Sequence, residues 1–156
     1  MQQKSKKTDV VGLIGFGIFL VLLGWTFIST PGLIESIKAF IIDFKLVEIS
    51  PNFFIPAPQN NHPILYGAVY NFCILFGIAQ IILLIIRFAL NDTSKGKGEN
   101  IGGIFFWFSA AYLVGLLSFG SLVWNAFVGS IVVIIGASII INVFATYALK
   151  KAWRKI

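Results

Sequence analysis

The chain is short of charged residues, and this shortage decides its class. Charged residues make up 12% of its 156 residues and hydrophobic residues 58%, whereas soluble domains are roughly 25% charged. A soluble protein of this length cannot bury so much apolar surface, but a lipid bilayer covers it. The composition therefore predicts an integral membrane protein, organised as one membrane domain over residues 1–156.

Cysteine and histidine are almost absent, with Cys73 and His62 the only examples. An intrachain disulfide, a CxxC redox pair and a thiolate metal cage all need more than one cysteine. Haem held by a pair of histidines is excluded in the same way. We therefore expect no cofactor and no metal site, and we interpret Cys73 as a small packing residue inside an apolar helix.

The longest charge-free stretch covers residues 101–149, which contain no Asp, Glu, Lys, Arg or His. As a single helix it would be roughly 74 Å long, far beyond a hydrocarbon core of about 30 Å. It must fold back once, and the bend is expected at 118–121, where Gly120 lies between two serines. The stretch thus predicts a tight helical hairpin with spans at about 101–118 and 122–149.

Two further apolar runs, at about 10–28 and 64–90, precede this hairpin. The basic start before residue 10 is typical of a signal peptide. However, the first run is longer than an ordinary signal core and no small-residue cleavage site follows it. We interpret it as an uncleaved first span. The sequence therefore predicts an all-α fold of four transmembrane helices, arranged as a four-helix bundle.

The segment 29–63, between the first two spans, begins with an amphipathic pattern over 33–45. This pattern predicts an extracytoplasmic helix that lies in the membrane interface. The alternative is a helix packed on a partner subunit. Four prolines then forbid a long helix over 46–63, and an ordered loop that caps the bundle is expected. Three of its residues are candidate partner contacts: Phe53, Phe54 and His62.

Polar and small residues form a narrow stripe along the second span. Tyr66, Tyr70, Cys73, Gly77 and Gln80 follow each other at steps of four and three, and Asn71 lies beside them. Amides and hydroxyls in a membrane face protein or water, because an unsatisfied polar group in lipid is expensive. We interpret the stripe as the bundle-facing side. The alternative is the wall of a small-molecule, quinone or ion site.

Small and polar residues also mark faces of the last two spans. Gly115 continues a small-residue face of the third span, and Ser138 and Asn142 share a face of the fourth. Together with the stripe these residues are the candidates for helix packing or for lining a pathway. The complete set is Tyr66, Tyr70, Asn71, Gly77, Gln80, Gly115, Ser138 and Asn142.

The distribution of Lys and Arg predicts the orientation. Ten of the twelve lie in the N-terminal tail, the 87–100 segment or the C-terminal tail, and the other two, Lys38 and Lys45, lie in the segment between the first two spans. Basic residues favour the cytoplasmic side. Both termini are therefore expected in the cytoplasm of a multi-pass protein of the cell membrane. The net charge is +6, and the basic residues lie beside the apolar spans. We therefore expect them to contact lipid headgroups and not nucleic acid.

No charged residue lies in the central part of any predicted span. This argues against proton-coupled transport and voltage sensing, which use intramembrane charges. We expect no enzymatic activity. The leading hypothesis is a non-catalytic subunit or scaffold that contacts other membrane subunits, or copies of itself, through helix packing and its outer segment. The alternatives are an oligomeric pore or passive transporter for a small solute and, as the third and weakest, an enzyme or lipid-binding module with the 50–63 loop as its site.

Overall fold

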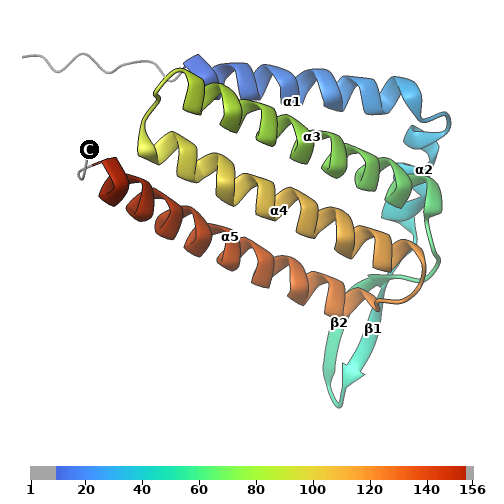
Figure 1. Cartoon of the computed structure of the whole chain (residues 1–156). Helices are drawn as coiled ribbons and strands as arrows, with labels where there is room; N and C mark the ends of the chain where they lie inside the picture. Colours follow the sequence, from blue (N-terminus) through green and yellow to red (C-terminus); the bar gives the residue numbers. More distant parts are fainter. Residues whose placement is uncertain (1–9, 154–156) are drawn as a thin grey trace, which may run out of the picture.

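The computed structural model describes residues 10–153, which form five helices and one two-stranded sheet (Figure 1). The elements in chain order are α1 (Val10–Ser29), α2 (Leu33–Ile42), β1 (Phe44–Ser50), β2 (Phe53–Pro58), α3 (Pro63–Ala89), α4 (Ser94–Ser118) and α5 (Trp124–Trp153). Four of these helices, α1, α3, α4 and α5, are long and apolar enough to cross a membrane. The basic tail residues counted above at 4, 6, 7, 154 and 155 lie outside the described residues.

The four predicted spans are present as helices, and the predicted bend at 118–121 is confirmed. Gly120 follows the last residue of α4 with a φ of 68°, a left-handed conformation that glycine adopts without strain. The backbone N–H of Ser121 donates to the carbonyl of Leu116 over 2.9 Å, which closes the helix end. The fourth span, α5, runs a few residues beyond the predicted bounds at its C-terminal end.

The third span begins earlier than predicted, because α4 starts at Ser94 inside the expected polar loop at 91–100. Thr93 caps this helix with its hydroxyl, which accepts from the backbone N–H of Gly96 over 3.1 Å. Glycine is a poor helix former, but here the neighbouring helix leaves no room for a side chain. A Cβ added to Gly98 would lie 2.9 Å from the backbone oxygen of Asn142. Close packing therefore overrides local propensity.

The helices form a single open row in the order α1, α3, α4, α5 (Figure 1). This arrangement differs from the closed four-helix bundle that we expected. Among the described residues α1 and α5 lie at opposite edges of the row and do not pack together as a pair. Short turns make α3, α4 and α5 sequential neighbours. Between helices in lipid there is no hydrophobic drive to close the row, since lipid tails cover apolar faces as well as another helix does.

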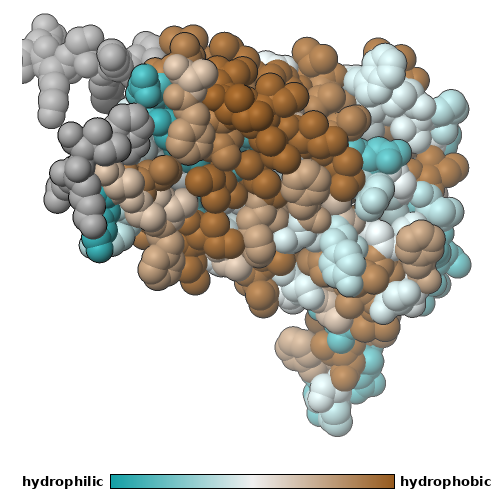
Figure 2. Space-filling model, viewed as in Figure 1, coloured by the Kyte–Doolittle hydropathy of each residue, from teal (hydrophilic) through white to brown (hydrophobic). Residues whose placement is uncertain are grey.

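The two ends of the row differ in chemistry. At the basic end α1 and α4 begin and α3 and α5 finish, and this end carries Arg87, Lys95, Lys97, Lys150 and Lys151. The hairpin end holds α2, the sheet and the α4–α5 turn (Figure 1). On the face drawn in Figure 2, hydrophobic residues cover the middle of the helices and hydrophilic residues gather toward both ends. This banding matches a bilayer with two polar interfaces.

The prolines of the 46–63 segment led us to expect a loop. The segment instead contains most of an antiparallel β-hairpin formed by β1 and β2. The amphipathic helix before it also ends earlier than predicted, at Ile42. Pro56 and Pro58 occupy alternate positions of β2, so both backbone nitrogens face away from β1 and lose no ladder bond. The carbonyl of Pro56 points the same way and accepts from the indole N–H of Trp124 over 3.1 Å. The all-α assignment is therefore incomplete.

Aromatic rings hold the outer segment against the helices at the hairpin end. Phe40 of α2 lies edge-on to the rings of Tyr66 and Trp124, with centroids 6.2 and 5.9 Å away. Tyr66 is buried against Val114 and Leu117 of α4. Edge-to-face pairs add stabilisation beyond their buried area. Phe40 thus anchors the amphipathic helix α2 to Tyr66 of α3, which packs on α4, and to Trp124 of α5.

Candidate functional site

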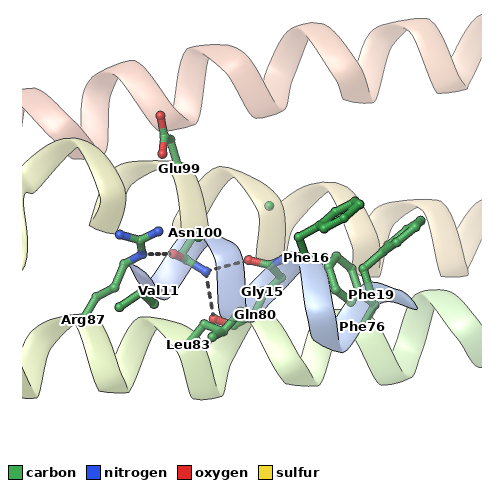
Figure 3. A pocket seen from close by; sticks show the side chains of 12 residues that line it. Val11, Gly15, Phe16, Phe19, Phe76, Gln80, Leu83, Arg87, Glu99 and Asn100 are labelled. Carbon is green, nitrogen blue, oxygen red and sulfur yellow. Dashed lines mark hydrogen bonds between the residues drawn. The ribbon is translucent and has the colours of Figure 1, made fainter. Parts of the chain in front are cut away.

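Three polar side chains are connected by hydrogen bonds where α3 ends and α4 begins (Figure 3). The Nε–H of Arg87 donates to Oδ1 of Asn100 over 2.6 Å, and Nδ2 of Asn100 donates to Oε1 of Gln80, also over 2.6 Å. Arg87 and Asn100 are only 4% and 5% exposed. Because a buried polar group is costly unless it is paired, this Arg87–Asn100–Gln80 network fixes the relative position of the two helices.

Charged residues complete the same end of the hairpin. Arg87 also pairs with the carboxylate of Asp92 through Nη1. Lys97, 1% exposed, places its ammonium 4.7 Å from the centre of the Phe88 ring, a cation–π distance. The sequence predicts Arg87 near the end of the second span and Lys97 in the short polar segment after it. The structure instead brings two cations into the interior of the basic end.

A groove of about 440 Å³ lies beside this network, between α1, α3 and α4 (Figure 3). Its polar part is lined by Gln80, Arg87, Glu99 and Asn100, and its aromatic part by Phe16, Phe19 and Phe76. The aromatic side chains lie farther from the basic end than the network does (Figure 3). The groove is therefore amphipathic along the direction of the helices, with its polar part nearest the charged end of the molecule.

Glycines keep this groove open. Gly15 packs against Leu83, where an added Cβ would lie 3.1 Å from Cδ1 of the leucine. Gly103 faces Gln80, and its added Cβ would lie 3.3 Å from Oε1. Both distances are tighter than ordinary carbon contacts. A side chain at either glycine would occupy the groove wall or push its neighbours.

A second hollow, of about 270 Å³, lies between α4 and α5 at the same end. Ser138 and Asn142 line it, and Glu99 and Gly103 belong to both hollows. Three of the candidate residues from the sequence, Gln80, Ser138 and Asn142, therefore lie around one pair of α4 residues. They face two adjoining hollows.

The remaining packing or lining candidates from the second, third and fourth spans lie away from these two hollows. Tyr66 is buried in the aromatic cluster and Gly77 is packed against the Phe108 ring, 3.2 Å from an added Cβ. The Tyr70 ring packs on Gly115 of α4, where an added Cβ would lie 3.6 Å from the ring, and both residues line a separate hollow of about 280 Å³. Asn71 is exposed on α3. The stripe itself faces α4 along its whole length, as interpreted from the sequence: its five residues all contact that helix, namely Tyr66, Tyr70, Cys73, Gly77 and Gln80.

The candidate partner contacts in the outer segment divide into two kinds. Phe53 and Phe54 are 57% and 53% exposed on β2. His62 is 9% exposed, and its Nε2 lies 3.0 Å from Oδ2 of Asp43. A residue so deeply placed offers little surface to a partner. The hairpin phenylalanines remain available for one, whereas His62 acts within the chain.

Asp43 joins the end of α2 to the approach to α3. Its carboxylate accepts from both the backbone N–H and the side-chain amide of Asn60, each over 2.7 Å, and it contacts His62. The backbone hydrogen bond from Asn60 and the contact with His62 lower the pKa of Asp43 from 3.8 to about 2. This carboxylate clamp holds the two ends of the hairpin segment together.

Sequence analysis missed the residues that make the basic end compact. Gly98 and Gly102 form a small-xxx-small pair, and an added Cβ at Gly102 would lie 2.8 Å from the Ser138 backbone oxygen. This spacing is a recognisable signal for close helix contact. The Arg87–Asn100 pair had a weaker signal: a polar residue at the end of one span and at the start of the next, joined by a short turn.

The arrangement offers binding surfaces but no evident reaction centre. Among residues 10–153, no group of three or more His, Cys, Asp or Glu side chains could hold a metal ion. The one cysteine, Cys73, is buried between α3 and α4, which is unfavourable for a nucleophile. The chain matches no protein-family model, and neither a curated protein nor a solved structure is detectably similar to it.

Proposed function

We propose that this protein is a non-catalytic membrane subunit or scaffold that works by packing against other membrane-embedded chains. The observation that carries this proposal is the open row of helices: no residue of α5 from Trp124 to Ala152 is buried within the chain, although α4 covers one side of the helix. A transmembrane helix at the edge of such a row offers its free side to a partner.

The free side of α5 has the shape that helix partners use. Gly129 and Gly136 are seven residues apart and have nothing within 4 Å of an added Cβ. Small residues at this spacing let a second backbone approach closely. The β-hairpin lies at the start of α5 and extends outward beyond that edge of the row (Figure 1), with Phe53 and Phe54 exposed. A partner seated on α5 would meet helix and hairpin together.

The orientation of the assembly follows from charge. We propose a multi-pass protein of the cell membrane, with both termini in the cytoplasm and the amphipathic helix and hairpin outside. Ten of the twelve Lys and Arg support it, because basic segments are retained on the cytoplasmic side. The lipid bilayer and other membrane subunits, or copies of the chain itself, are then the partners.

The test is the native mass of the protein after extraction in a mild detergent. We expect a mass above that of one chain, from a co-purifying subunit or a second copy. Gly136→Leu should release this partner, because the larger side chain blocks close approach to α5. Gly17→Leu is the matched control, since Gly17 also faces open space but lies on α1. A single chain without partners, in detergent and in nanodiscs alike, would contradict the proposal.

The alternative is a pore or passive transporter built by oligomerisation. It would need Gln80, Ser138 and Asn142 to face a common path, and these residues already lie near Gly103 in adjoining hollows. Solute flux into liposomes that rises with protein density would favour this alternative. Absence of flux together with a stable complex would favour the subunit.

A further inference from the structure

We propose that the groove between α1, α3 and α4 binds one anionic phospholipid, with its phosphate headgroup at the polar part and one acyl chain along the aromatic part. This goes beyond the proposed function, because it concerns a small amphiphile and not a protein partner. The occupant is a lipid of the surrounding membrane.

The order of chemical groups along the groove matches a phospholipid. Gln80, Asn100 and Glu99 offer amide and carboxylate groups at the basic end, and Phe16, Phe19 and Phe76 follow toward the middle of the row (Figure 3). In a bilayer the headgroup also lies at the interface, and the acyl chain runs inward beside the helices. An amphiphile in the groove would keep both ends in their ordinary environments.

The charge of the basic end selects an anionic headgroup. The described residues place five cations there, Arg87, Lys95, Lys97, Lys150 and Lys151, against two carboxylates, Asp92 and Glu99. Of the cations, Arg87 lines the groove itself and pairs with Asp92, and Lys95 lies 3.6 Å from Glu99. The excess positive charge is therefore a property of the whole basic end around the groove. Cations near the membrane surface attract anionic lipids. Glu99 is the carboxylate that lines the groove, so it is the one group that opposes a phosphate at this position.

The packing of α1 makes room for the acyl chain. This helix packs on α3 but does not form a packed pair with α4, so the surface of α3 and α4 beside it stays uncovered. Phe19 contacts Phe76 edge to face at 5.4 Å, which gives the groove an aromatic wall. Phe16 is 60% exposed at its edge, so a lipid can enter from the side.

The hollows elsewhere in the described chain suit a lipid less well. The hollow beneath α2, about 200 Å³, is lined by apolar side chains such as Leu33, Leu65 and Phe72 and has no charged residue for a headgroup. The α4–α5 hollow shares Glu99 and Gly103 with the groove and could take part of a larger headgroup. The proposal therefore rests on the α1–α3–α4 groove alone.

The experiment is native mass spectrometry of the full chain, delipidated in nonionic detergent and then mixed with phosphatidylglycerol or phosphatidylcholine of identical acyl chains. We expect one retained phosphatidylglycerol and roughly tenfold weaker retention of phosphatidylcholine. Inorganic phosphate at millimolar concentration should not displace the lipid, because the acyl chain contributes to binding. The same spectra distinguish bound lipid from a second protein chain, so the two proposals fail separately.

Two variants test the position of the lipid. Gly103→Leu should lower retention of phosphatidylglycerol roughly tenfold by filling the groove beside Gln80, whereas Gly129→Leu on the open face of α5 should retain it. Glu99→Gln changes an exposed side chain, so the fold is preserved, and it should strengthen retention roughly fivefold. Equal retention of both lipids, displacement by inorganic phosphate alone, or no effect of Gly103→Leu and Glu99→Gln would overturn the proposal.

Discussion

Gly102 in α4 lies so close to Ser138 in α5 that a Cβ on the glycine would be 2.8 Å from the serine backbone oxygen. Backbone on both sides of the contact leaves no flexible side chain to move away. The spacing between the two helices is therefore fixed at this point, and with it the second hollow of the basic end.

Gly102→Ala should destabilise the protein by about 1–3 kcal/mol, because the added methyl group must push two backbones apart. Thermal unfolding in detergent measures the loss. Gly129→Ala is the matched control: the added methyl group meets nothing within 4 Å, and alanine favours the helix. If both variants have the same melting temperature, the close backbone contact between α4 and α5 at Gly102 does not exist.

Asn100→Ala should cost about 1–3 kcal/mol, because it removes the acceptor of the Arg87 Nε–H and the donor to Gln80 from a buried hydrogen-bond network. Asn71→Ala, on the exposed side of α3, should leave the melting temperature nearly unchanged. The comparison needs only thermal unfolding of the two variants beside the parent chain. Equal melting temperatures would show that the network contributes nothing to stability.

Acidification should loosen the outer segment through Asp43. Since its pKa is lowered from 3.8 to about 2 in the folded chain, the carboxylate stabilises the fold fully above about pH 4, and this contribution is lost as the pH falls toward 2. Hydrogen-exchange protection over 44–58, taken relative to the intrinsic exchange rate at each pH, should therefore fall in that range. Asp43→Asn should show low protection already at neutral pH, and protection of the parent chain that does not change between pH 4 and 2 would refute the clamp.

Cysteine labelling tests the orientation. A cysteine at Asn60 should react with an impermeant reagent added outside, and one at Lys95 should not, because basic segments stay in the cytoplasm. Both positions are exposed. Native Cys73 is buried, which keeps the background low. The reverse labelling pattern would invert the proposed topology.

Replacing Phe53 and Phe54 by Ser tests the hairpin as a contact surface. Both side chains are more than half exposed, so the double variant should fold with an unchanged melting temperature but lose its partner in native mass measurements. Phe40→Ser is the contrasting variant. Phe40 packs on Tyr66 and Trp124, so this substitution should lower the melting temperature of the chain. Loss of the fold in the double variant would instead favour a lid that seals the helices.

The sequence by itself determined the four apolar helices, the bend at Gly120 and the presence of an amphipathic helix between the first two spans. These features depend on hydrophobic length, glycine at a turn and the helical period, which are local properties of the chain. The sequence did not determine that α4 begins at Ser94, because its first turns contain glycines that only tertiary contacts explain: Gly96 lies against Arg87 of α3 and Gly98 against α5.

Tertiary structure decided the β-hairpin, the open row and the basic-end groove. Pro56 and Pro58 argue against a strand until the ladder shows that their nitrogens face outward. Apolar helices in lipid specify length but not which neighbour they choose, because lipid satisfies their faces equally well. Arg87 and Asn100 become partners only when the short turn places α3 beside α4, a relationship between distant positions that periodicity does not contain.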